Sequence, residues 1–495
     1  MESTVLINST FNETRVAVME NGALAELYLE RKSRPQIVGN IYKGRVGKIV
    51  PGMQAAFIEL GLEKSGFISV EDVQEDSFPE FFLEEEEELP SSKKTNKYLI
   101  QDMLREGQEV LVQVLKESVG GKGAKLSSYI ALPGKYLVLL GTVDLVGISR
   151  RIDDREERKR LTSIIKESKP RGIGFIARTA SVGKTKDEIE KDMQYLAGIW
   201  EEIKRKSEEH KAPVLLYEEP SLHIKAIRDL VTEEIKSIVI DTNEVYQEIF
   251  DYLQAHFPGS NTRIELHKGP TPLLVKYGVE PEIKTIFEKK VWLKSGGYLI
   301  IEETEALTVM DINTGRYISS DNHEDNIFDI NMEAASEAAR QIRLRNLVGI
   351  IVIDFIDMKN RQKRDDVFQS FAEALKKDKA RSVILDMSPF GVVQMTRQRV
   401  RESLLKSLAE PCSHCGGIGY EKSRDTVSYE ILREIKAHIA KPLVRKIIVR
   451  ANPEVMATLR EIEGKNIKQL EEEYSVGIHL EAEDCKLADF WVRAE

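Results

Sequence analysis

Two apolar segments that end in acidic residues limit the fold of this chain more than any other feature. The segment "ALTVMDIN" leads into Asp311 and Asn313, and the segment "VGIIVIDFID" ends in Asp354 and Asp357. Continuous apolar runs of this kind suit buried central strands. A helix-like segment, "NMEAASEAARQIRLRNL", separates them, and strand and helix patterns alternate over residues 283–395. This alternation predicts an α/β architecture.

The aspartates at the ends of these segments indicate a cation site. Functional residues of α/β units gather at the carboxyl ends of strands, so Asp311 and Asp354 are expected to converge. Ionised carboxylates at such a place are costly unless a cation compensates them, and oxygen ligands of this kind suit Mg²⁺. Asn313 shares a strand face with Asp311 and can orient its carboxylate or a phosphate. The pattern alone also allows aspartates that only end strands or cap helices, and we interpret Asp357 as such a structural acid.

Composition limits the class of protein. A chain of 495 residues suggests about three or four domains. The net charge of -10 argues against a general basic surface for nucleic acid, so any such contact must depend on local patches. The sequence has three cysteines, no apolar run of about 18 residues and no signal-like start. We therefore expect a protein without a membrane segment, located in the cytoplasm.

The first part of the chain is rich in strand patterns. Residues 1–33 contain several short apolar segments typical of strands. Short strands with Gly and Pro turns over residues 39–115 predict a small β-barrel, interrupted by an exposed insertion at 78–97. Phe57 and Phe67 lie in this barrel. Aromatic rings on a small barrel can stack on nucleic-acid bases, but alternation alone favours a place in the barrel core.

Residues 120–209 combine a Gly/Lys turn, "GGKGAKLS", with strands and two helices, at about 153–169 and 186–209. The segment "ARTASVGKT" is similar to a phosphate-binding P-loop, but Arg178 stands where that loop needs its first glycine, which argues against a nucleoside triphosphatase. Arg178 and Thr179 instead suit a terminal phosphate, since a guanidinium beside a hydroxyl can bind it. An ordinary arginine in a turn is the alternative.

Cys412 and Cys415 form a C-x-x-C pair that is followed by glycines. A structural zinc needs four ligands, so two copies of the chain would complete a site. Alternatives are a redox pair, which needs a thioredoxin βαβ context that the sequence does not show, and a site completed by His414. The tail that follows has a β-α-α-β pattern without the G-x-x-G loop of a KH domain, which favours a packing or oligomerisation domain.

Long motifs give the chain a resemblance to a known family. The segments "EALTVMDINTG", "EAARQIRLRNLVGIIVIDFIDM" and "VVQMTRQR" resemble the catalytic part of the ribonuclease E/G family. "GIGFIARTASVGK" resembles the family's 5′-monophosphate sensor, and the cysteine segment resembles its zinc-link, with Ser413 and His414 where proline is common. The chain length favours the layout of the ribonuclease G branch, without the long disordered arm of many ribonuclease E proteins.

The resemblance implies an α/β multidomain fold. Its parts are an RNase H-like subdomain (1–35 and 216–282), an inserted S1 barrel of the OB type (36–118), a 5′-sensor (119–215), a DNase I-like catalytic subdomain (283–405), a zinc-link (406–420) and a small C-terminal α+β domain (421–495).

The resemblance also implies an activity and its residues. The activity is Mg²⁺-dependent cleavage of single-stranded, A/U-rich RNA to 5′-phosphate and 3′-hydroxyl ends, favoured by a 5′-monophosphate, in rRNA maturation and mRNA decay. A homodimer or larger homo-oligomer would share the zinc. The implied residues are Asp311 and Asp354 for magnesium and catalysis, Asn313 as their assistant, Phe57, Phe67, Arg178, Thr179, Gly123 and Arg150 for RNA, and Cys412 and Cys415 for Zn²⁺. A non-catalytic RNA-binding protein and a nuclease acting on DNA are the rival functions.

Overall fold

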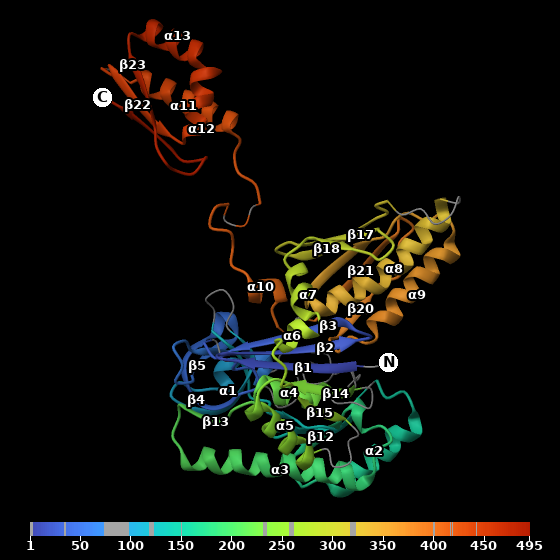
Figure 1. Ribbon diagram of the computed structural model, residues 1–495. Coiled ribbons are helices and arrows are strands. Elements are labelled where there is room, and N and C mark those ends of the chain that lie inside the picture. The colour runs from blue at the N-terminus through green and yellow to red at the C-terminus, as the bar shows by residue number, and fades with distance from the viewer. Residues whose placement is uncertain are drawn as a thin grey trace. The chain divides into compact units, whose positions relative to one another are not determined.

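The computed structural model forms two compact units, Met1–Ser407 and Leu408–Glu495. Its described residues contain five β-sheets (Figure 1). In this part of the chain, no helix has the length and apolar character needed to cross a membrane. The described residues are 3–33, 36–73, 99–117, 123–149, 151–230, 235–256, 262–316, 323–398, 401–415, 417, 419–441 and 443–495.

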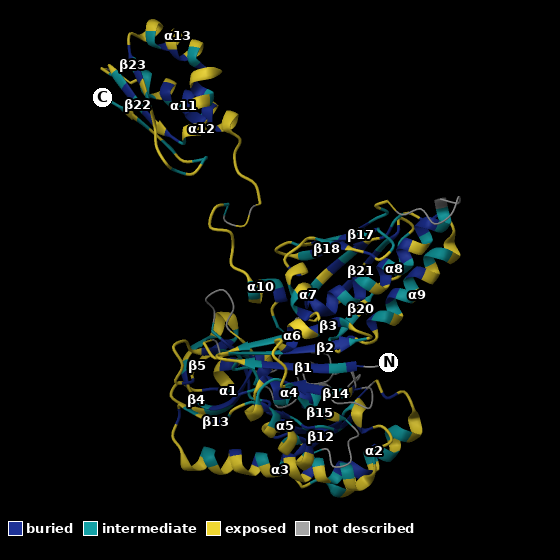
Figure 2. Ribbon diagram, in the orientation of Figure 1, coloured by how far each residue is buried: buried dark blue, intermediate teal, exposed yellow. Residues whose placement is uncertain are grey.

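The first sheet joins two segments that lie far apart in the sequence. Its order is β15-β14-β1-β2-β3, with parallel pairing of β14 to both β1 and β15 and antiparallel hairpins from β1 to β3. Helices α4 and α5 pack on it, and its middle strands are mostly buried (Figure 2). The elements are β1 Ser3–Thr10, β2 Glu13–Glu20, β3 Ala23–Arg31, α4 Leu222–Leu230, β14 Ile235–Ile240, α5 Asn243–His256 and β15 Arg263–Leu266.

The predicted small barrel is present. Its strands run β13-β4-β5-β6-β8-β7, and an additional pairing of β4 with β7 closes strands β4 to β8 into a barrel, to which β13 adds by pairing with β4. The expected insertion at 78–97 lies outside the described residues. The elements are β4 Ile41–Val50, β5 Ala55–Glu59, β6 Gly66–Ser69, α1 Ile100–Met103, β7 Glu109–Lys116, β8 Lys125–Ser127 and β13 Val214–Tyr217.

A third sheet, β11-β12-β10-β9, packs with helices α2 and α3. The segment that is similar to a P-loop starts α3: the Thr185 hydroxyl accepts a hydrogen bond from the Glu188 N–H, and the Glu188 carboxylate accepts one from the Thr185 N–H. This capping box satisfies helix-start donors. The elements are β9 Ala131–Pro133, β10 Leu137–Leu140, β11 Val146–Ile148, α2 Arg155–Ser168, β12 Gly174–Ala177 and α3 Lys186–Glu209.

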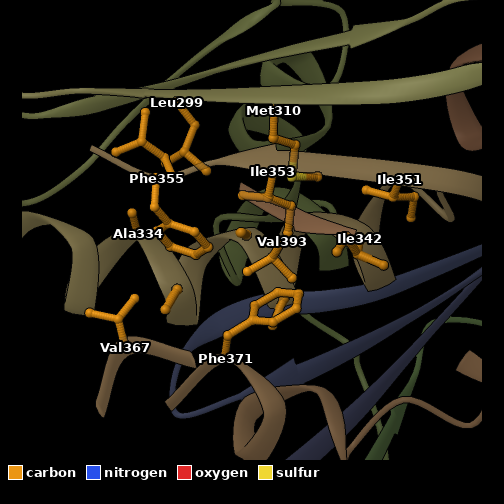
Figure 3. Packing of buried hydrophobic residues seen from close by; sticks show 14 of the residues in the cluster. Leu299, Met310, Ala334, Ile342, Ile351, Ile353, Phe355, Val367, Phe371 and Val393 are labelled. Carbon is orange, nitrogen blue, oxygen red and sulfur yellow. The ribbon is translucent and has the colours of Figure 1, made fainter. Parts of the chain in front are cut away.

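The fourth sheet, β16-β17-β18-β19-β21-β20, contains the two apolar segments as its central strands β18 and β19, which pair in parallel. Helices α8 and α9 cover one face, where Leu299, Met310 and Ile353 pack (Figure 3). The elements are α6 Leu273–Lys276, α7 Val279–Thr285, β16 Lys290–Trp292, β17 Tyr298–Glu303, β18 Leu307–Asn313, α8 His323–Leu344, β19 Gly349–Asp354, α9 Arg361–Leu375, β20 Ser382–Ile384, β21 Val392–Arg397 and α10 Leu404–Leu408.

The opposite face of this sheet differs from the expectation of buried strands. Ile350 is exposed, and Val309 and Val352 are only half-buried. Both faces of β18 and β19 therefore carry apolar side chains. One face packs in the core, and the other is accessible to solvent. Periodicity cannot show this, because both faces carry apolar residues.

The C-terminal unit is a small α+β domain, as predicted. Its sheet runs β23-β22-β24, with β22 parallel to β23, and its helices share one apolar core with the sheet. The elements are α11 Arg424–Ile439, β22 Lys446–Ala451, α12 Pro453–Glu461, α13 Gly464–Tyr474, β23 Gly477–Ala482 and β24 Phe490–Ala494.

Candidate functional site

The structure brings Asp311 and Asp354 together. They are direct partners in the parallel pairing of β18 with β19. Because side chains alternate along a strand, both carboxylates lie on the face opposite the core residues Met310 and Ile353, and both are exposed. Adjacent strands lie about 4.8 Å apart. The two carboxylates are thus neighbours on an open sheet face.

Asn313 lies on the same strand face, two residues beyond Asp311. Its side-chain Nδ2 donates a hydrogen bond to Asp311 Oδ2 at 2.9 Å. This contact fixes the rotation of the Asp311 carboxylate and leaves its other oxygen for another ligand.

The local electrostatics penalise two ionised carboxylates. Burial at the end of β19, the charge of Asp311 and the charge of Asp357 together raise the pKa of Asp354. Asp357 lies beyond the end of β19 and is exposed, with Oδ1 beside Gly391. A cation between Asp311 and Asp354 would remove this repulsion, which makes the pair chemically suited to one.

The open face also carries aromatic residues that the sequence analysis missed. Trp292 on β16 and Tyr298 on β17 are direct partners, and Tyr298 is in turn the partner of Asn313 on β18. The segment "KVWLKSGGYLI" contains the pattern that could have revealed them. Trp292 and Tyr298 alternate there with the core residues Val291 and Leu299, on either side of a Gly-Gly turn.

Phe57 and Phe67 form a cross-strand pair between β5 and β6 of the barrel. Phe57 is 36% exposed and Phe67 is half-buried, whereas the neighbouring Ile58 and Ile68 belong to the barrel core. The interpretation from alternation, that both rings lie in the core, is wrong. Alternation identifies two faces of a strand but does not say which face is the core when both carry apolar residues.

Two basic residues on β4, the strand that pairs with β5, already have partners. Lys43 Nζ donates to the carbonyls of Ser207 and His210 and pairs with Glu109 at 2.8 Å. Arg45 donates to the Ala212 carbonyl at 2.8 Å. These two cations therefore hold the barrel against the end of α3 and the chain after it.

Arg178 is more constrained than a surface arginine. Its Nη1 donates to the Gly134 carbonyl at 2.6 Å, its Nη2 donates to Asp229 Oδ1 at 3.1 Å, and its side chain is 17% exposed. Thr179 is exposed at the start of a short 3₁₀ turn. The two residues are thus adjacent, but Arg178 also serves to hold the chain together.

The other two candidates for the terminal phosphate are Gly123 and Arg150. A Cβ added to Gly123 would lie 1.9 Å from the Ser65 carbonyl oxygen, so close approach of the backbone requires glycine there. The structure thus places Gly123 against the barrel, next to β8. Arg150 lies outside the described residues.

Cys412 and Cys415 are free thiols in the C-terminal unit. The Gly419 N–H donates to Cys415 Sγ at 3.3 Å, and this contact with others from the backbone lowers the pKa of Cys415. His414 Nε2 is bonded to Glu421 Oε2 at 2.8 Å. Among the described residues, no group of three or more His, Cys, Asp or Glu side chains lies together as a metal site.

Comparison with known proteins identifies the family. The model of the Ribonuclease E/G family matches residues 131–400, which is more than half of the chain. The chain belongs to the ribonuclease E/G family. The S1 RNA binding domain model matches residues 36–128, which contain strands β4 to β8 of the barrel.

Individual members of the ribonuclease E/G family are similar over nearly the whole chain. Ribonuclease G of Escherichia coli (strain K12) is 40% identical over 475 residues, which is 95% of each chain. Ribonuclease G of Haemophilus influenzae is 39% identical over 95% of this chain and 97% of its own. Ribonuclease E of Haemophilus influenzae is 36% identical over 96% of this chain but only 50% of its own.

The expectation that the chain lacks a thioredoxin context is wrong for the C-terminal unit. A ribonuclease E/G thioredoxin-like domain model matches residues 411–490, so the thioredoxin context that the sequence analysis did not find is present. It escaped detection because the parallel pair β22 and β23 comes well after the cysteines and is joined by two helices. Cys412 and Cys415 lie ahead of α11, and they do not follow a strand as a redox pair of this fold does.

Proposed function

We propose that this chain is an endoribonuclease that uses Asp311 and Asp354 to hold a divalent cation against the scissile phosphodiester of RNA. One observation carries the proposal: the two carboxylates are register partners on adjacent parallel strands, on the face opposite the core, where both side chains are exposed. Membership of the ribonuclease E/G family and the S1 domain support RNA as the substrate.

The residues present fit Mg²⁺. This ion typically takes one or two carboxylates and fills its other positions with water and substrate phosphate, which two aspartates on an open face allow. When bound, the cation activates water as the nucleophile and neutralises charge on the phosphate. Asp311 and Asp354 would hold it, and Asn313 keeps the Asp311 carboxylate oriented through its hydrogen bond. The products are a 5′-phosphate and a 3′-hydroxyl.

The subdomain assignments belong to the same proposal. We assign residues 1–35 with 216–282 to an RNase H-like subdomain, supported by the pairing of β1 with β14. Residues 283–405 are assigned to a DNase I-like catalytic subdomain and residues 119–215 to a 5′-sensor. The substrates are single-stranded A/U-rich sites in rRNA precursors and mRNA. The described cysteines are all free, which suits the cytoplasm.

A cleavage assay on short oligonucleotides tests the proposal. We expect Mg²⁺-dependent cleavage of single-stranded RNA, no cleavage in chelator, and faster cleavage of 5′-monophosphorylated than of 5′-hydroxyl RNA. A guanidinium has five N–H donors, so the contacts of Arg178 to Gly134 and Asp229 leave donors that can bind a phosphate beside Thr179. Binding without cleavage would favour the non-catalytic rival, and equal cleavage of single-stranded DNA would favour the DNA nuclease.

Phe57 and Phe67 are proposed to stack on RNA bases. We expect Phe57→Ala to weaken the binding of single-stranded RNA by about 1–3 kcal/mol, because an accessible ring supplies stacking of that size. Fluorescence anisotropy with a labelled oligoribonucleotide measures the change. The thermal stability should stay within a few degrees, and Ile58→Ala, in the barrel core, is the control that should lower it. A loss of thermal stability in Phe57→Ala would instead support the interpretation that the Phe57 ring belongs to the barrel core.

The cysteine pair is proposed to bind Zn²⁺ shared between two copies of the chain. Two thiolates per chain are half of a tetrahedral set, and no third ligand lies beside them in the described residues. We expect a chelator or Cys412→Ser to convert dimers into monomers, measured by sedimentation, and metal analysis to give one zinc ion per two chains. Cys485→Ser, which removes the other free thiol of this unit, should leave the dimer intact. A stable metal-free dimer would contradict the proposal.

A further inference from the structure

The open face of the fourth sheet carries an aromatic cluster beside the carboxylates, formed by Lys290, Trp292 and Tyr298. The rings of Trp292 and Tyr298 meet edge to face, with centroids 5.3 Å apart. The Lys290 ammonium lies 3.8 Å from the Trp292 ring centre and 3.6 Å from the Tyr298 ring centre. Despite these contacts, Trp292 is 62% exposed. The indole is therefore held by its neighbours and still accessible to a ligand.

The strand registers place this cluster in line with the carboxylates. Trp292, Tyr298 and Asn313 are successive partners across β16, β17 and β18. Leu299 and Met310, which alternate with Tyr298 and Asp311, point toward the helices, so the cluster lies on the opposite face with the carboxylates (Figure 3).

A second set of register partners, which includes Lys290, also leads to the carboxylates. Lys290, Ile300, Asp311 and Asp354 are successive partners across four adjacent strands. With strands about 4.8 Å apart, Tyr298 lies roughly 5 Å and Trp292 roughly 10 Å from Asn313 along the sheet. This is the scale of one nucleotide next to the bond that is cut.

We propose that Trp292 and Tyr298, with Lys290, bind the base of a nucleotide adjacent to the scissile phosphate. The inference rests on the proposed function, because the carboxylates define where that phosphate lies. Aromatic rings stack on any base without needing a particular sequence, and a cation among them attracts the phosphate backbone. The cluster thus aligns the RNA strand across the sheet.

The chemistry of the cluster favours RNA over a protein partner. In the described residues, Lys290 has no carboxylate partner, whereas its neighbour Lys289 pairs with Glu302 at 2.8 Å. The charge of Lys290, which no carboxylate among the described residues neutralises, and the exposed indole are therefore presented together, on the face where the substrate must pass. A second copy of the chain on this face is the alternative occupant, and the test below separates the two.

The test measures RNA binding in the cleavage-deficient background Asp354→Asn, by anisotropy of a labelled single-stranded oligoribonucleotide. We expect Trp292→Ala to weaken binding by about 5- to 100-fold and to abolish most of the tryptophan quenching caused by RNA. Trp491→Ala is the matched control, since this tryptophan is 50% exposed in the C-terminal unit. Trp200 is buried and should not respond. Tyr298→Phe keeps the ring and should bind normally, whereas Tyr298→Ala should not.

Unchanged binding and quenching in Trp292→Ala would overturn the inference, and so would a change in oligomeric state that accounts for the lost affinity. Failure of the parent chain to cleave RNA with Mg²⁺ would instead contradict the proposed function. The binding and quenching measurements do not depend on cleavage, so the two failures are distinguishable.

Discussion

Replacing Asp354 by asparagine is expected to reduce RNA cleavage by at least about 10³-fold while leaving RNA binding nearly unchanged. The substitution keeps the size of the side chain and removes one of the two charges that face each other across β18 and β19. A cation that stabilises the transition state contributes several kcal/mol, and each 1.4 kcal/mol is about tenfold in rate. Asp311→Asn should have an effect of the same size. Single-turnover cleavage of a labelled oligoribonucleotide measures both.

Asp357→Asn is the matched control, because Asp357 lies just beyond β19 and is exposed. Asp357→Asn should lower the rate of RNA cleavage by less than about tenfold. Thermal denaturation gives a second measurement: Mg²⁺ should stabilise the parent chain by binding its folded form, and this stabilisation should be lost in Asp311→Asn. Without metal, Asp311→Asn should be at least as stable as the parent, since it removes repulsion between like charges. Cleavage at the parent rate in either aspartate variant would remove its proposed role.

The sequence was sufficient to locate the catalytic candidates because the relevant information is local. Apolar segments end at Asp311 and Asp354, and such segments form adjacent strands in α/β units. The spacing of Asn313 from Asp311 follows from the two-residue period of a strand. The C-terminal α+β pattern and the two long helices of the third sheet were predicted on the same basis.

Other features depend on contacts between distant segments and could not be predicted. The partner of Arg178 is Asp229, 51 positions away in the sequence, and no local pattern indicates it. The family resemblance grouped residues 1–35 with 216–282, but no local pattern indicated that β1 pairs with β14. Phe57 and Phe67 were ambiguous because a barrel strand can carry apolar residues on both faces, and the fold alone decides which face is the core.

The basic residues of the long family motifs prove to have a structural role. Arg343 on α8 donates to Glu20 at 2.5 Å and to Glu26 at 2.7 Å, both in the first sheet. Arg397, at the end of β21, pairs with Asp378 at 2.5 Å. The segment that contains the candidate residue Asp354 therefore also carries Arg343, whose contacts help to hold the fourth sheet in place.

Asp378→Ala is expected to lower the stability of the larger unit by about 3–5 kcal/mol, because it leaves the guanidinium of Arg397 buried without a counter-ion. The two side chains are 6% and 3% exposed. Arg397 also donates to Asn346 Oδ1 and the Leu347 carbonyl, so it links the end of β21 to the end of α8. Urea denaturation followed by tryptophan fluorescence measures the effect as a shift of the transition, since a multidomain chain need not unfold in one step.

The pair of Glu373 and Lys376 on the end of α9 is the matched control. Both side chains are 72% exposed, so Glu373→Ala should change stability by at most about 1 kcal/mol. A double variant, Arg397→Met with Asp378→Leu, separates the cost of an unpaired charge from the value of the pair itself. We expect it to regain most of the stability lost in Asp378→Ala, because apolar residues of similar volume often replace a buried ion pair without loss. A double variant as unstable as Asp378→Ala would mean that the hydrogen bonds of Arg397 to Asn346 and Leu347, rather than its charge balance, hold β21 against α8.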